Sequence, residues 1–223
     1  MKFWRYFFLF CLVQAVQTVL AKAKTAESGV EDLSALEFRE GRDYFSYKIP
    51  IAVEQSNEKK IRIQSFFDYD CRVCVNTQDI LTLYSQINPN SVIVEEYPVA
   101  TSKARFSAQV YYSLKRLNHE DLSDSLLFET SDAERYREIS KYENLLAWLK
   151  KQKVDTELFN DIFTSEETAR KVEQAIELTE KYGVFTYPFV VIDGKYVLTN
   201  STLYNDDYTF AVLDFLVHKL MDE

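Results

Sequence analysis

The sequence predicts an α/β domain in which helices cover a sheet, and three observations carry this prediction. Apolar segments with strand-like patterns alternate along the chain with segments that have helical apolar spacing. The last two strand-like segments, 189–192 and 195–198, flank Asp193-Gly194, which is a strong signal for a tight hairpin turn. The chain has 223 residues, of which 47% are hydrophobic, and this suffices for one sizeable core but hardly for two full domains.

The first half of the domain has a strand–helix–strand pattern. Residues 61–67 alternate between apolar and polar side chains, which predicts a strand. Helical spacing then runs from 75 to 87 and stops at Asn88-Pro89-Asn90. A second strand is expected over 91–97, with Pro98 at its end.

The block at about 100–165 predicts a set of helices inserted into this pattern. Helices are expected over 102–117, 144–151 and 155–163, because their apolar residues have helical spacing. No linker rich in Pro, Gly or Ser separates the block from its neighbours. We therefore expect an inserted helical subdomain rather than a separate domain.

Two further helices complete the domain. The helix at 164–183 has a buried apolar stripe, Thr164 and Glu167 predict a capping box at its start, and Gly183 fits its C-terminal end. An amphipathic helix over 208–221 follows the hairpin and ends the chain.

The N-terminus predicts a cleavable signal peptide over residues 1–23, followed by a flexible leader over 24–36. A short positive start precedes an apolar run at 6–13, and Ala21-Lys22-Ala23 has the small-x-small form of a cleavage site. The alternative is an uncleaved membrane anchor, but the clean apolar run is too short to span a bilayer comfortably. We therefore expect an exported protein that is soluble after signal cleavage.

The charge of the chain argues against one class of partner. The formal net charge is −9, and residues 1–23 carry basic but no acidic side chains, so their removal makes the mature chain more acidic. A strongly acidic protein repels phosphate backbones, and no nucleic-acid partner is expected.

The number and spacing of the cysteines decide among a structural disulfide, a metal site and a redox pair. Cys11 lies in the predicted signal peptide, so the mature chain keeps only Cys71 and Cys74. A disulfide between them would close a tiny loop and stabilise the fold little, although an inert local disulfide remains an alternative. A zinc site needs two more ligands, and His119 and His218 are far away in the sequence. The favoured hypothesis is a pair that exchanges electrons, with no metal.

The place of the pair also favours redox chemistry, because it lies where a strand runs into a helix. Unpaired N–H groups and the helix dipole at a helix N-terminus stabilise a thiolate, which is the species that attacks disulfides. We expect Cys71 to be the exposed nucleophile and Cys74, one helical turn later, to be the more buried resolving thiol.

The cysteine segment and the hairpin segment together point to a known family. The stretches "IQSFFDYDCRVC" (63–74), "EEYPVA" (95–100) and "KYGVFTYPFVVIDGKYVL" (181–198) resemble the DsbA-like thiol:disulfide oxidoreductases. The likeness extends over nearly the whole mature chain, with the domain at 37–223. It implies a thioredoxin fold with an inserted helical subdomain.

The resemblance also implies site residues, partners and a location. Pro188 is expected to follow a cis peptide bond and to pack against the disulfide, and the backbone of Tyr187 is expected to pair with a substrate chain. The alternative is a trans proline that merely begins a strand. The implied substrates are cysteine-containing secreted proteins in the periplasm, and a membrane redox partner would recycle the pair. No organic cofactor is implied.

The residues around the cysteines depart from the family pattern. Strongly oxidising members usually have Pro-His between the cysteines, whereas this chain has Arg72 and Val73, which would tune the active site differently. The cation of Arg72 would favour the thiolate, unless its side chain points to solvent. Asp68 and Asp70 would act in the opposite direction if they approach the sulfur, although Asp70 could instead cap the helix.

Two further departures leave the direction of electron flow open. The family's buried acid on the first strand is replaced by Ser65, and the residue before the proline is the large Tyr187. The favoured function is donation of the Cys71–Cys74 disulfide to secreted proteins. One alternative is a reductase or disulfide isomerase that a membrane electron donor keeps reduced. The other is a non-catalytic, chaperone-like protein that binds partners through a groove lined by Tyr187 and the aromatic residues at 66–69.

Overall fold

The computed structural model describes residues 37–53 and 60–223, and the compact domain spans Phe38–Glu223. The predicted signal peptide (1–23) and leader (24–36) lie outside the described residues. Across the described ranges, no helix is both long enough and apolar enough to cross a membrane.

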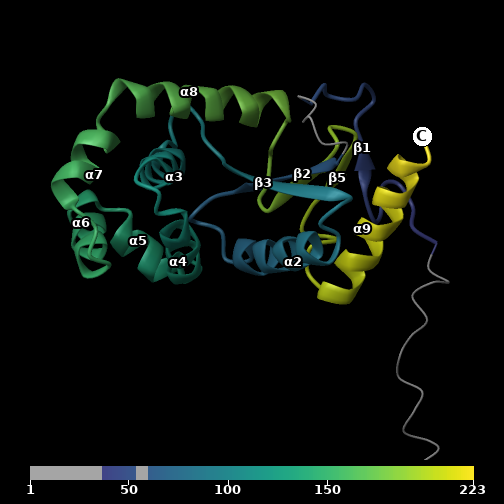
Figure 1. Cartoon of the computed structure of the whole chain (residues 1–223), viewed down its shortest axis with the longest axis horizontal. Coiled ribbons are helices and arrows are strands. Elements are labelled where there is room, and N and C mark those ends of the chain that lie inside the picture. The colour runs from purple at the N-terminus through teal and green to yellow at the C-terminus, as the bar shows by residue number, and fades with distance from the viewer. Residues whose placement is uncertain (1–36, 54–59) are drawn as a thin grey trace, which may run out of the picture. The chain divides into compact units, whose positions relative to one another are not determined.

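One mixed sheet forms the centre of the domain. Within the described residues it has five strands in the order β1-β5-β4-β2-β3 (Figure 1). The strands are β1 (Phe45–Ser46), β2 (Ile61–Phe67), β3 (Val92–Pro98), β4 (Phe189–Ile192) and β5 (Tyr196–Leu198). The pair β2–β3 is parallel, and the other pairs are antiparallel. The parallel pair requires a crossover connection, which the helix between the two strands supplies.

The helices fall into three groups around this sheet. They are α2 (Cys74–Ile87), α3 (Phe106–Arg116), α4 (Glu120–Thr130), α5 (Ala133–Ile139), α6 (Tyr142–Lys151), α7 (Thr156–Phe163), α8 (Glu166–Lys181) and α9 (Asp206–Met221). Helices α2 and α9 lie side by side near the sheet, α3 to α7 gather beyond its edge, and α8 runs back from that group to the sheet (Figure 1). The sequence prediction of an α/β thioredoxin fold with an inserted helical subdomain is confirmed.

Strand β4 is wholly apolar because both of its faces are buried. Val190 and Ile192 belong to the core cluster that also contains apolar residues of α2 and α9. Phe189 and Val191 point to the other face, where they pack with Tyr182 at the end of α8. A strand buried on both faces has no position for a polar side chain, which explains its continuous apolar run.

The inserted helices have a core of their own, and this core reaches the cysteines. Its buried members come from α3, α4, α5, α6 and α7, and they include Leu126, Trp148 and Phe159. Cys71 and Cys74 belong to the same cluster. The helical subdomain and the cysteine loop therefore share one hydrophobic core.

The residue that caps the start of α8 differs from the one that the sequence predicts. Ser165 is its N-cap and accepts a hydrogen bond from the N–H of Thr168 (3.2 Å), so the predicted capping box of Thr164 and Glu167 is wrong by one residue. The Thr164 hydroxyl instead donates to the carbonyl of Asn160 in α7 (2.8 Å). Because α7 ends just before α8, the Thr164 hydroxyl bonds to a carbonyl of α7, and Ser165 caps α8 in its place.

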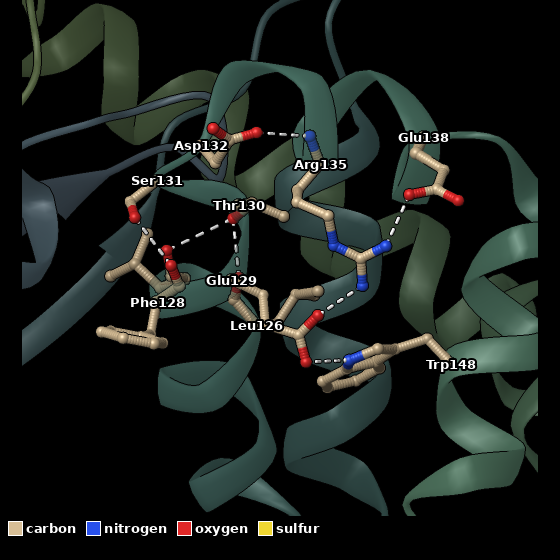
Figure 2. Close-up of polar contacts among 10 residues, drawn as sticks. Leu126, Phe128, Glu129, Thr130, Ser131, Asp132, Arg135, Glu138 and Trp148 are labelled. Carbon is tan, nitrogen blue, oxygen red and sulfur yellow. Dashed lines mark hydrogen bonds and ion pairs between the residues drawn. The ribbon is translucent and has the colours of Figure 1, made fainter.

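A polar network fixes α5 between α4 and α6 (Figure 2). The guanidinium of Arg135 donates to Glu129 of α4 (2.6 Å) and to Glu138 (2.5 Å). Glu129 also accepts from the indole N–H of Trp148 on α6 (2.7 Å). Asp132 caps α5 by accepting from the N–H of Arg135 (2.9 Å). The short α5 is thus bonded directly to α4, and Glu129 of α4 links this pair of helices to α6.

The predicted hairpin turn is confirmed and explains one glycine. Asp193 and Gly194 have φ values of +50° and +64°, and the N–H of Lys195 donates to the carbonyl of Ile192 (3.0 Å). Gly194 also accepts from the N–H of Ile51 (2.8 Å), and a Cβ at position 194 would overlap the Ile51 carbonyl. Both the conformation and the close approach require glycine.

We expect Gly194→Ala to destabilise the domain more than Gly183→Ala. Gly183 also has a positive φ (+61°), but a Cβ there meets no atom within 4 Å. Gly183→Ala is therefore the control, and its free energy of unfolding should fall only by the cost of the left-handed conformation, about 1–2 kcal/mol. Gly194→Ala should lose at least about 1 kcal/mol more, because the backbone at Ile51 must shift. Urea unfolding of both variants measures the difference, and equal losses would contradict the close approach.

Candidate active site

Strand β2 delivers the cysteine pair to the start of α2. Cys71 and Cys74 form a disulfide with their Cα atoms 5.5 Å apart. Helix α2 begins at Cys74 with Val73 as its N-cap, and Val73 offers no side-chain cap. Cys71 therefore precedes the helix by one turn rather than forming its first residue. Its sulfur is held near the helix start by the disulfide.

Both cysteines are buried, whereas the residues between them are not. The exposed fraction is 3% for Cys71 and 2% for Cys74, but 47% for Val73, and Arg72 is exposed too. The expectation of an exposed Cys71 is therefore wrong. The reason is that the inserted helices and the loop before β4 contribute rings to the cluster that surrounds the pair. The expected burial of Cys74 is confirmed.

Tyr69 anchors the cysteine loop to the inserted helices. It is fully buried, and its N–H donates to the hydroxyl of Ser107 on α3 (3.1 Å). Its own hydroxyl bonds with that of Ser123 on α4 (2.8 Å). These bonds satisfy polar groups that would otherwise be costly to bury. The loop that carries Cys71 is thus positioned by two helices far away in the sequence.

A hydrogen bond joins the two acidic residues before Cys71. The N–H of Asp70 donates to the carboxylate of Asp68 (2.7 Å), and Val73 rather than Asp70 is the helix N-cap. The interpretation of Asp70 as a helix cap is therefore wrong. Burial raises the pKa of Asp68, which the bond from Asp70 and a contact with Ser107 partly offset.

The loop before β4 reaches the same place from the other side. The Tyr187–Pro188 peptide bond is cis, as the resemblance implies, and Pro188 is buried. Tyr187 is half-buried and packs against the cluster that contains both cysteines. Burial raises the pKa of its hydroxyl, and the charges of Asp68 and Asp70 add to the rise. The tyrosine therefore lies beside the cysteine loop.

Tyr136 of α5 and Asp132, the N-cap of that helix, also lie near the site, although nothing in the sequence singles them out. Tyr136 packs against the cysteine cluster, and its pKa is raised to about 12 by burial and by the charges of Asp68 and Asp70. Hydrogen bonds from backbone N–H groups, first that of Arg135, lower the pKa of Asp132, and the nearby charge of Arg72 contributes. Arg72 thus has an acidic neighbour on the inserted helices.

A carboxyl group lies beneath α2, one strand away from the position of the missing acid. Ser65 of β2 pairs in register with Glu96 of β3. The side-chain amide of Gln78 on α2 donates to Glu96 (2.6 Å) and to Asp124 on α4 (2.7 Å). Burial, together with the charge of Asp124, raises the pKa of Glu96 to about 7. Sequence reasoning missed Glu96 because strand register is not visible in one sequence.

Comparison with known proteins agrees with this geometry. A protein of Haemophilus influenzae, described as uncharacterized, is 51% identical over 220 residues and is matched over 94% of its length by 96% of this chain. The thiol:disulfide interchange protein DsbA of Bordetella parapertussis is 28% identical over 161 residues, which are 71% of this chain and 76% of that protein. No family model matches the chain.

Solved structures show the same architecture. The crystal structure of Pseudomonas aeruginosa DsbA matches with a TM-score of 0.71 at 23% identity, over 83% of this chain and 95% of that one. The oxidoreductase NmDsbA1 of N. meningitidis matches with a TM-score of 0.68 at 20% identity, over 82% and 94%. The chain is therefore similar to DsbA proteins in sequence and shares their fold. It is a thiol:disulfide oxidoreductase with the thioredoxin fold.

Disulfide exchange depends on a thiolate, and the acidic residues just before Cys71 are expected to oppose its formation. We expect Asp68→Asn to lower the pKa of the reactive thiol by about half a unit, since removal of a nearby negative charge favours the thiolate. Asparagine keeps an oxygen that can accept the bond from Asp70. The thiolate's ultraviolet absorbance, followed against pH in the reduced protein, measures the shift.

The matched control is Asp161→Asn, which removes an exposed charge from α7. It should leave the thiol pKa unchanged. A shift of the same size in both variants would mean that net charge, and not the position of Asp68, sets the pKa.

Proposed function

We propose that this DsbA-like protein is exported to the periplasm, where it donates the Cys71–Cys74 disulfide to cysteines of secreted proteins. One observation supports the proposal above all: the disulfide lies in the same cluster as Tyr187, next to the cis Pro188. A substrate chain that pairs with the backbone at Tyr187 would bring its thiol to this disulfide. The predicted signal peptide at 1–23 motivates the assignment to the periplasm.

The proposed reaction transfers two electrons from the substrate to the pair. A substrate thiolate attacks the sulfur of Cys71, the bond between the two cysteines breaks, and Cys74 leaves as a thiolate that takes up a proton. A second substrate thiolate then attacks the substrate sulfur of the mixed disulfide and releases Cys71. The substrate gains a disulfide and the pair becomes a dithiol. A membrane redox partner would re-oxidise the dithiol.

Arg72 and Val73 are the proposed tuning residues, and Tyr187 and Pro188 the proposed substrate-binding residues. The exposed cation of Arg72 lies between the cysteines and favours the thiolate, although Asp132 offsets part of its charge. Val73 is 47% exposed and offers an apolar contact to an arriving chain.

A reductase or isomerase is the second candidate, and the charges around the pair favour it. Asp68 and Asp70 stand directly before Cys71, and Pro-His is absent between the cysteines. A less stable thiolate makes the dithiol form less favourable relative to the disulfide. The protein would then reduce the disulfides of its substrates rather than oxidise their thiols. Titration against glutathione separates the two candidates: a potential near about −120 mV indicates an oxidase, and one near about −270 mV indicates a reductase.

We expect Cys71→Ser to abolish the oxidation of a reduced two-cysteine peptide, because the attacked sulfur is lost. Cys74→Ser should instead accumulate a mixed disulfide when it is given the disulfide-bonded form of the peptide. Its Cys71 thiolate attacks the peptide disulfide and releases one peptide thiolate, and no Cys74 thiol is present to resolve the new bond. Mass spectrometry of the quenched reaction identifies the linked residue. Retention of oxidising activity by Cys71→Ser would refute the proposed mechanism. Full biological function in a variant lacking both cysteines would favour a chaperone-like role instead.

A further inference from the structure

Two tyrosines from different parts of the fold pack against the core cluster that contains the cysteine pair. Tyr136 comes from α5 of the inserted helices and Tyr187 from the loop before Pro188. Both are half-buried, and both pack against the cluster that contains Cys71 and Cys74. Each is close enough to Asp68 and Asp70 to feel their charges, and these residues directly precede Cys71. We call Tyr136 and Tyr187 the aromatic cover.

The position of Tyr136 is determined by rigid contacts. Its neighbour Arg135 is held between Glu129 and Glu138, and Asp132 caps the helix (Figure 2). Its ring also lies edge-on to that of Phe106, with centroids 6.2 Å apart. Because α5 is fixed in this way, Tyr136 cannot leave the pair without work against these contacts.

Rings of Tyr136 and Tyr187 placed over the pair would account for cysteines that are buried beside exposed neighbours. Cys71 is 3% exposed, yet the intervening Val73 is 47% exposed. Disulfide exchange requires the attacking sulfur to reach the target sulfur directly, so access governs its rate. With the cover in place, an attacking thiolate must displace an aromatic side chain first.

A polypeptide and a small thiol differ in how they can meet this requirement. An extended chain can pair with the backbone at Tyr187, and that binding energy is available to move the cover. A small thiol makes no such contacts, so nothing offsets the displacement of the rings. Binding energy from remote parts of a substrate can in this way be converted into specificity.

We propose that Tyr136 is a specificity-determining residue: with Tyr187 it covers the disulfide and so favours polypeptide thiols over small thiols. The inference rests on the proposed exchange at Cys71, but it does not depend on the direction of electron flow. Tyr136 acts through access to the sulfur and takes no part in bond breaking.

The test compares the rates at which two thiols reduce the oxidised protein. Dithiothreitol serves as the small thiol, because its attacking thiolate carries the same single negative charge as a cysteine thiolate. The charges of Asp68, Asp70, Arg72 and Asp132 therefore act on the two nucleophiles alike. An unfolded peptide with one cysteine serves as the polypeptide thiol. For Tyr136→Ala we expect the dithiothreitol rate to rise at least about tenfold, with the peptide rate changed by less than about threefold.

Two variants and one control make the result specific. Tyr136→Phe keeps the ring and should resemble the unchanged protein, whereas Tyr136→Leu keeps apolar volume for folding and should still open the cover. Tyr204→Ala removes a tyrosine that is 67% exposed and packs on Tyr208, away from this cluster. It should leave the ratio of the two rates unchanged.

The equilibrium potential against glutathione separates a cover from a redox effect. A cover alters the rates in both directions, so the potential of Tyr136→Ala should equal that of the unchanged protein. An unchanged dithiothreitol rate, an equal rise for both thiols, or a potential shift that accounts for the rate would each overturn the proposal. Failure of peptide oxidation in the unchanged protein would instead overturn the proposed donor function, because the ratio of reduction rates is measured separately.

Discussion

The burial of Tyr69 between two inserted helices is the contact on which the active site depends. Strand β2 ends two residues earlier, and the disulfide begins two residues later. The bonds of Tyr69 to Ser107 and Ser123 join this short connection to α3 and α4. Without them, a fully buried hydroxyl and a backbone N–H would lack partners. The cysteine loop therefore takes its position only when the helical subdomain has folded.

This dependence makes the insertion more than a decoration on a thioredoxin fold. The cysteines follow β2, and the cis proline directly precedes β4. These two strands pair with each other at Phe66 and Phe189, so the cysteines and the proline come from the same end of the pair. The insertion supplies the core into which both cysteines are packed and the ring of Tyr136. Two parts of the chain that are far apart in the sequence thus contribute to one core around the cysteines.

The electrostatics of the site show a similar division between local and distant groups. Asp68, Asp70 and Arg72 are visible beside the cysteines in the sequence, and their charges could be anticipated. Asp132 and Glu96 could not, because they reach the site through the placement of α5 and through the register of β3. The two hidden carboxylates change the interpretation, since one offsets Arg72 and the other lies beneath α2 near the position of Ser65.

The sequence by itself determined the order of the strands, the boundaries of β2 and β4, the turn at Asp193-Gly194 and the cysteine pair with its distant proline. These features depend on apolar periodicity, on backbone conformations that few residues adopt, and on a distinctive residue spacing, all of which are local. The sequence predicted the insertion as helical but did not predict α4 or α5. Only the tertiary structure decided that Cys71 is buried, that Asp70 does not cap α2, and that Tyr136 faces the site. Each of these depends on contacts between segments far apart in the chain, and no local pattern records which distant side chain will fill a given space.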